Sequence, residues 1–186
     1  MGKRSNFERN PKDFYETPIK AVKPLIPHLP GYFTWIEPCV GEGKLANHIE
    51  TLWPSNRCVG VYDFHPNDYD FNSTKADASI YIYPKNSHDG DYRPETDLFI
   101  TNPPWSRDIL HPIIDNLAGQ KPTWLLFDSD WMHTKQAIPY LEYCVKIVSV
   151  GRVSWMENGV SGMDNCCWYL FDKTYRNTFK TIFIGR

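Results

Sequence analysis

The feature that most constrains the fold is a regular alternation of short apolar segments with longer amphipathic ones. Buried strands are predicted at 33–38 (FTWIEP), 57–64 (RCVGVYDF), 97–102 (DLFITN) and 123–130 (TWLLFDSD), and a weaker strand at 75–83. Helices are predicted between them at 40–52, where a glycine turn precedes an apolar face, and at 107–118. Strands that alternate with helices predict a parallel sheet with right-handed crossover connections.

The two ends of the chain depart from this alternation. Thr17-Pro18 has the form of a helix N-cap followed by proline at the first helical position, and predicts a helix over 17–29 that its own prolines shorten. Near the other end, residues 144–156 and 165–172 flank a turn-rich segment and predict an antiparallel hairpin that closes the sheet edge. The predicted fold class is therefore α/β, a Rossmann-like doubly wound sheet that is mostly parallel, with an antiparallel C-terminal hairpin.

Composition limits the number of domains and the class of protein. The 186 residues are 41% hydrophobic, which suits one core, so we expect a flexible tail at 1–12 and a single domain over 13–186. No apolar run is long enough to cross a bilayer, and the N-terminus lacks the apolar core of a secretory signal. Five cysteines without CxxC spacing favour free thiols and a cytoplasmic location. The formal charge of −2 gives no overall electrostatic argument for nucleic-acid binding and leaves a local basic patch open.

A glycine turn follows the first predicted strand. Glu37 ends that strand, and Gly41 and Gly43 lie in the turn, where glycines let the backbone approach a cofactor closely. Asp63 ends the second predicted strand about twenty residues later, a position at which an acid can bind ribose hydroxyls. The Glu37 carboxylate would repel a pyrophosphate, so this turn favours a cationic ligand such as a sulfonium over a dinucleotide.

The segment Asn102-Pro103-Pro104-Trp105 ends the strand predicted at 97–102. Proline pushes the residue before it toward extended geometry, so we expect Asn102 to project from the strand tip. The Asn102 side-chain oxygen and the Pro103 carbonyl match the two hydrogens of an exocyclic NH₂ group, and Trp105 offers a flat face to a base. Alone, the segment fits two interpretations about equally well: a functional site, or a purely structural role in which Asn-Pro-Pro ends the strand and Trp105 is a core aromatic. Its position after the glycine turn and Asp63 favours a functional site.

These motifs occur in a recognisable order: FYETP (14–18), EPCVGEG (37–43), Asp63, Asp77 and NPPW (102–105). In this order the chain resembles the class I S-adenosylmethionine-dependent methyltransferases over roughly residues 13–172. Within that class it is most similar to the small phage-type, Dam-like, adenine-N6-specific DNA methyltransferases. The resemblance implies S-adenosylmethionine as cofactor, bound by Tyr15, Thr17, Pro18, Glu37, Gly41, Gly43, Asp63, Asp77 and Asn102. It implies catalytic roles for Asn102, Pro103, Pro104 and Trp105. The family more often has Tyr or Phe at the last of these positions, and Trp keeps the stacking face.

The implied reaction is methyl transfer to the N6 amino group of an adenine that is flipped out of DNA. No segment is long enough for a separate target-recognition domain, so target specificity is expected to rest on 84–96, on the region after the strand at 123–130, and on the turn at 157–165. The same motif also serves RNA adenine-N6 methyltransferases and protein glutamine-N5 methyltransferases. A non-catalytic module that keeps the fold and binds DNA or a protein is a further alternative.

Two other kinds of site are less favoured. Cys39 lies in the cofactor loop, which is the wrong place for a catalytic nucleophile, and a small packed residue is the preferred interpretation. The histidines His65, His111 and His133 lack the spacing of metal ligands, so no metal site is expected. The expected partner is DNA, with RNA as the rival and no membrane, while the sequence leaves the oligomeric state open.

Overall fold

A computed structural model of the chain describes residues 15–66, 72–83, 95–155, 165–174 and 180–185. The tail expected at 1–12 lies outside these ranges, as do most of 84–96 and 157–165, two of the three segments on which target specificity was expected to rest. The strands are β1 Phe33–Glu37, β2 Asn56–Asp63, β3 Thr74–Lys75, β4 Leu98–Thr101, β5 Thr123–Asp128, β6 Cys144–Arg152, β7 Asn165–Phe171 and β8 Ile182–Ile184. The helices are α1 Ile19–Val22, α2 Lys44–Leu52, α3 Arg107–Ala118 and α4 Ile138–Leu141, with 3₁₀ turns η2 Ile26–His28, η4 Ser129–His133 and η5 Lys135–Ala137.

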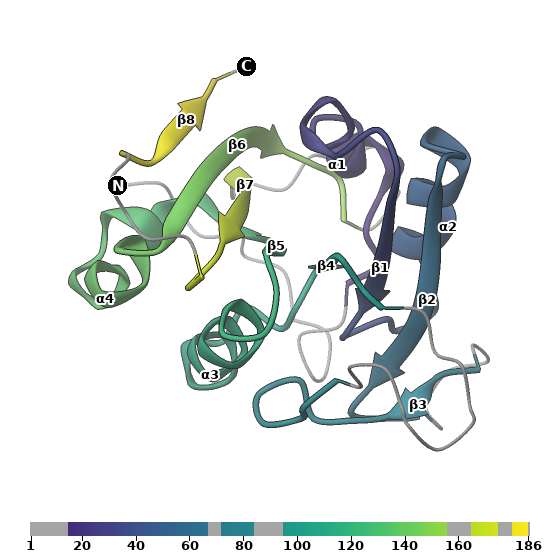
Figure 1. Ribbon diagram of the computed structural model, residues 1–186. Helices are drawn as coiled ribbons and strands as arrows, with labels where there is room; N and C mark the ends of the chain where they lie inside the picture. Colours follow the sequence, from purple (N-terminus) through teal and green to yellow (C-terminus); the bar gives the residue numbers. More distant parts are fainter. Residues whose placement is uncertain (1–14, 67–71, 84–94, 156–164, 175–179, 186) are drawn as a thin grey trace.

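Within the described residues, eight strands form one sheet in the order β3-β2-β1-β4-β5-β7-β6-β8 (Figure 1). β1 is parallel to β2 and β4, β2 to β3, and β4 to β5, whereas β7 is antiparallel to both β5 and β6. The predicted fold class, a mostly parallel sheet with an antiparallel hairpin, is confirmed. The position of the hairpin differs from the expectation, because β7 lies inside the sheet and the unpredicted β8, parallel to β6, forms the edge.

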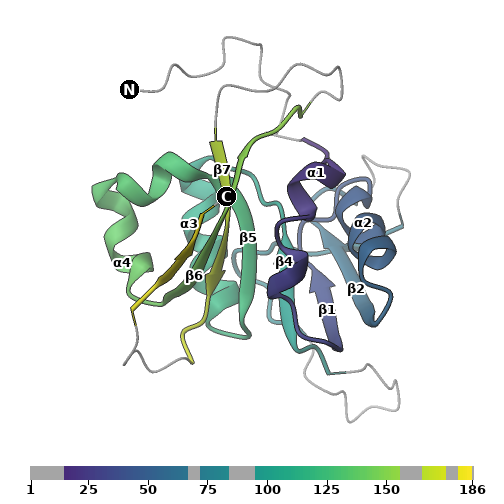
Figure 2. The ribbon, with the colours of Figure 1, turned by 90° about the horizontal axis from the view of Figure 1, so that it is seen from above.

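Helices cover both faces of the sheet. α1 and α2 lie on one face, and α3 and α4 on the other (Figures 1 and 2). Successive side chains of β4 show the alternation: Leu98 and Ile100 pack in the core under α1 and α2, while Phe99 packs in the core under α3. Burial on both faces explains why the central strands are continuous apolar runs in the sequence.

Two predicted elements are shorter in the structure. The helix expected over 17–29 is reduced to α1 and the turn η2, because Pro24 and Pro27 cannot donate the backbone hydrogen bonds of a continuing helix. Pro18 occupies the N-cap position without a side-chain hydrogen bond, so the assignment of Thr17 as the cap is wrong.

The weak strand expected at 75–83 ends after Lys75. Beyond it, Asp77 begins a turn in which its carboxylate accepts hydrogen bonds from Ser79, a local bond that competes with strand pairing. In the described part of the chain, no helix is both long and apolar enough to span a membrane.

Candidate active site

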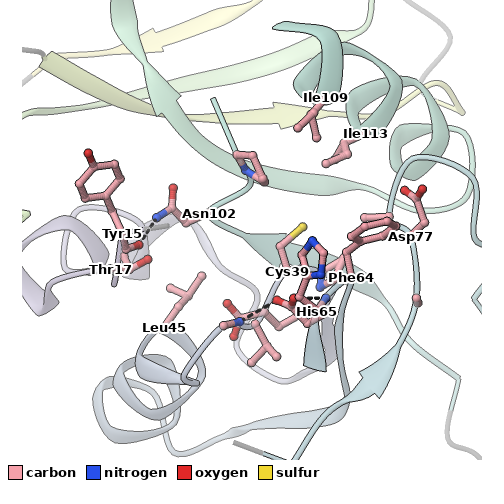
Figure 3. Close-up of a pocket in the computed structure, with 18 of the residues that line it drawn as sticks. Tyr15, Thr17, Cys39, Leu45, Phe64, His65, Asp77, Asn102, Ile109 and Ile113 are labelled. Carbon is pink, nitrogen blue, oxygen red and sulfur yellow. Dashed lines mark hydrogen bonds between the residues drawn. The ribbon is translucent and has the colours of Figure 1, made fainter. Parts of the chain in front are cut away.

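A cavity of about 570 Å³ opens where β1, β2 and β4 end (Figure 3). The order of the strands reverses between β1 and β4, the place where doubly wound sheets bind ligands. Most of the residues predicted from the sequence line this cavity: Tyr15, Thr17, Glu37, Gly41, Asp63, Asp77, Asn102 and Pro104. The others, Pro18, Gly43, Pro103 and Trp105, are adjacent to it in the chain but are not part of its wall.

The glycine turn after β1 is hydrogen-bonded to the Asp63 carboxylate. Gly41 and Gly43 have φ values of 52° and 78°, in the left-handed region that glycine tolerates best, and Gly43 is the N-cap residue of α2. The Gly41 N–H donates to Asp63 Oδ2 at 3.0 Å, and the His65 N–H donates to Asp63 Oδ1 at 2.8 Å. Each carboxylate oxygen therefore organises one backbone loop at the cavity. Ribose binding by Asp63 stays a prediction.

Glu37 places a buried carboxylate at the cavity. Its side chain is 1% exposed, and among the described residues its Oε2 has no hydrogen-bond partner. Burial raises the pKa of Glu37 well above its ordinary value of 4.5, the hydrogen bond from the Ala46 N–H opposes this, and the nearby Asp63 charge raises the pKa further. A buried carboxyl without a counter-charge binds either a proton or a cation. The residue therefore fits a cationic ligand.

Asn102 lies at the cavity beside Tyr15 and Thr17 (Figure 3). As the sequence predicts, it follows directly after β4, and its Nδ2 donates to the backbone carbonyl of Tyr15 at 3.1 Å. Its Oδ1 accepts from Trp105 Nε1 at 3.1 Å, and the same indole N–H donates to the Leu126 carbonyl at 3.1 Å. Trp105 thus contacts Asn102 through its edge, a bond that the sequence did not indicate.

The remaining acid of the predicted set is Asp77, in the turn after β3. Its Oδ1 accepts from the Ser79 N–H at 2.9 Å and from Ser79 Oγ at 2.6 Å. The small side chains of Ala76 and Ala78 line the cavity on either side of it. Asp77 is therefore oriented by its own turn, across the cavity from Asn102 (Figure 3).

Several apolar side chains of the wall were missed by the sequence reasoning. Phe64, directly after Asp63, is 53% exposed and lies edge-on to His65 with ring centroids 4.6 Å apart. Ile109 and Ile113 reach the cavity from α3 (Figure 3). Their spacing of four residues places them on one helix face, which was the available signal. Large apolar side chains at a cavity rim suit a planar ring.

Nucleophilic and metal chemistry gain no support here. Burial, with the negative charge of Asp63, raises the pKa of the Cys39 thiol far above neutral pH, and a thiol is a poor nucleophile compared with a thiolate. In the ranges that the structure describes, no group of three or more His, Cys, Asp and Glu side chains could hold a metal ion.

A scan against protein-family models and a search of curated proteins found no match. Solved structures of similar fold include the type I restriction-modification methyltransferase subunit from Streptococcus thermophilus (TM-score 0.56, 10% identity, 92% of this chain and 47% of that chain). A second is the 23S rRNA methyltransferase ErmE (TM-score 0.53, 14% identity, 86% of this chain and 70% of that chain). A third is a dimethyladenosine transferase from Plasmodium falciparum (TM-score 0.51, 16% identity, 85% of this chain and 62% of that chain). The chain thus spans about half the length of the Streptococcus subunit. At these identities the similarity concerns the fold, and it shows that this chain has the methyltransferase fold that the sequence predicts.

Proposed function

We propose that this chain is an S-adenosylmethionine-dependent methyltransferase that acts on the N6 amino group of adenine in DNA. The observation that carries the proposal is the convergence of two groups on one cavity. The buried Glu37 carboxylate reaches it from the end of β1, and the Asn102 amide reaches it from the end of the neighbouring β4. The Glu37 carboxylate suits a cationic methyl donor, and the Asn102 amide suits the amino group that accepts the methyl. Methyl transfer to nitrogen requires a site for each.

The cofactor half of the site consists of residues from three strand ends. Glu37 would receive a positively charged group of the cofactor, since its Oε2 is buried and no described residue satisfies it. Gly41 would leave room for close backbone approach, Asp63 would meet the ribose, and Asp77 the adenine amino group. When bound, S-adenosylmethionine supplies a methyl group on a cationic sulfur, which keeps the electron pair of the broken C–S bond.

The acceptor half is provided by Asn102 and Pro103. The Asn102 oxygen and the Pro103 carbonyl would each accept one hydrogen of the substrate NH₂ group and aim its lone pair at the methyl donor. Ile109 and Ile113 would keep water from this part of the cavity. After the new N–C bond has formed, the nitrogen gives one proton to water, so no strong base is needed.

The choice of nucleic acid is supported by both fold and sequence. The structures of similar fold include a restriction-modification methyltransferase subunit, a 23S rRNA methyltransferase and a dimethyladenosine transferase. The order of motifs resembles the DNA enzymes, and for this reason DNA is the proposed substrate. Adenine in RNA presents the same amino group to the same residues, and the test below includes it.

The test identifies the labelled product. The full chain is incubated with methyl-labelled S-adenosylmethionine and, separately, with duplex DNA, single-stranded DNA, RNA and total protein, and each substrate is digested. We expect N6-methyldeoxyadenosine, reduced about 100-fold or more in Asn102→Ala because the oriented acceptor is lost. Asn47→Ala, an exposed asparagine on α2, should keep full activity. Label confined to RNA or protein, or no label with the cofactor bound, would overturn the proposal.

A further inference from the structure

The orientation of the Asn102 amide is fixed from both sides. The oxygen and nitrogen ends of an asparagine side chain have nearly the same shape, so only their partners decide which end points where. At Nδ2 the partner is the Tyr15 backbone carbonyl, which can only accept, and at Oδ1 it is the Trp105 indole N–H, which can only donate. If the amide were rotated by 180°, Oδ1 would face the Tyr15 carbonyl, acceptor against acceptor. Nδ2 would then face the Trp105 N–H, donor against donor.

Trp105 is itself held in place. Its N–H is shared between Asn102 Oδ1 and the carbonyl of Leu126, both at 3.1 Å, and Leu126 is fully buried in β5. The indole ring packs against both hydrophobic cores and lies edge-on to Trp155 with centroids 5.3 Å apart at 88°. The indole therefore connects the buried backbone of β5 to the side chain of Asn102, which directly follows β4.

We propose that Trp105 is a positioning residue that holds the Asn102 oxygen toward the substrate amino group through its indole N–H. The proposal rests on the proposed function, in which that oxygen accepts a substrate hydrogen. A carbonyl oxygen has two lone pairs, so one stays available after the indole bond is made. Phenylalanine, one of the residues usual at this position, retains an aromatic ring and lacks this donor.

The first test measures the bond itself and needs no activity. Full-length protein labelled with ¹⁵N at tryptophan shows indole signals, and the Trp105 signal is assigned by its loss in Trp105→Phe. In Asn102→Ala, we expect the Trp105 indole proton to move upfield more than that of any other tryptophan, because one of its two acceptors is gone. An unchanged Trp105 signal would overturn the proposal. If Trp105→Phe does not fold, the signal is assigned instead by triple-resonance spectroscopy of wild-type protein labelled with ¹³C and ¹⁵N, so the test does not depend on that variant.

The second test separates positioning from binding. In Trp105→Phe, we expect kcat to fall about tenfold, the usual effect of one lost orienting hydrogen bond, while the Kd for S-adenosylmethionine stays within about twofold. Trp53→Phe is the matched control, since it removes an indole N–H that donates to the Pro30 carbonyl away from the cavity. An unchanged kcat in Trp105→Phe would overturn the positioning role. Absence of methyl transfer by the wild-type chain would overturn the proposed function and leave the first test valid.

Discussion

Replacing Glu37 with glutamine tests the cofactor half of the site most directly. The change keeps the shape of the side chain and one acceptor oxygen, and removes the negative charge from a residue that is 1% exposed. Because no described residue satisfies Oε2, the free protein loses no hydrogen bond at that atom when the charge is removed. The complex, in contrast, loses the charge that would face the cationic cofactor.

The expected loss of affinity follows from the burial of this carboxylate. Two opposite charges about 4 Å apart attract each other by about 4 kcal/mol at an effective dielectric constant near 20. Removing one partner of a buried charge pair costs roughly 2–5 kcal/mol in measured complexes. We take about 3 kcal/mol for Glu37→Gln, which weakens binding of S-adenosylmethionine about 150-fold.

Whereas Glu37→Gln should weaken cofactor binding, it should not destabilise the free protein at high pH, and we expect it to stabilise the protein there for the following reason. The raised pKa of Glu37 means that its stabilising contribution is complete below the ordinary value of 4.5 and is lost as the pH rises through the raised value. Wild-type protein should therefore lose stability over this range relative to Glu37→Gln, which has no proton to release. At pH 8 the variant should melt at the same temperature as the wild type or higher, in the absence of ligand.

Isothermal titration calorimetry at pH 8 measures the affinity, and thermal unfolding with and without ligand measures the stability. Glu50→Gln is the matched control, because it makes the same charge change at an exposed position on α2. S-adenosylhomocysteine, which keeps the ammonium and lacks the sulfonium, shows which cation Glu37 binds. If Glu37→Gln binds S-adenosylmethionine within about threefold of the wild-type affinity, the assigned role of the carboxylate is wrong.

Three further substitutions test the loops and core around the site. Asp63→Asn should lower the unfolding free energy in urea by about 1–3 kcal/mol, because an amide has one acceptor oxygen for two backbone N–H groups. Cys39→Ala should keep methyl transfer near the wild-type level, since the raised pKa of the thiol leaves no thiolate to act. Gly60→Ala should cost about 1–3 kcal/mol in the same denaturation assay, because its Cβ would lie 2.8 Å from the buried Tyr62 ring.

The central part of the fold was predictable because its signals are local. The boundaries of β1, α2, β2, β4, α3 and β5 agree with the apolar runs and the glycine turn, each of which a short window of sequence contains. The exception is β3, where the local Asp77 turn replaces most of the strand expected at 75–83. The place of β7 depends instead on contacts across the sheet, such as the stacking of Phe127 on Tyr169 at 4.1 Å. Within the described residues, the three-residue strand β8 pairs only with β6. Because Ile182 and Phe183 are more than half exposed, its sequence carries no burial pattern that would predict a strand.

The site was predictable to the extent that it depends on strand ends. Glu37, Asp63 and Asn102 each terminate or follow a strand, and parallel strands place those ends at one edge of the sheet. The sequence could not show that both Asp63 oxygens are already used by backbone N–H groups, because that depends on how two loops fold around one side chain. The edge contact of Trp105 likewise depends on the turn that follows Asn102.

The negative charges of the cavity wall restrict which part of a nucleic acid could enter the cavity. Three of the carboxylates in its wall come from strand ends and the turn beside them: Glu37 and Asp63 end β1 and β2, and Asp77 lies in the turn after β3. The nearby Lys44 is paired with Glu16. Phosphate groups would be repelled by this wall, whereas a neutral base would not. Under the proposed function, the sugar-phosphate backbone must therefore stay outside while the base alone enters, which requires the target adenine to leave its stack. Under the same proposal, the acidic wall that would favour a cationic methyl donor would also keep the polyanionic backbone out of the active site.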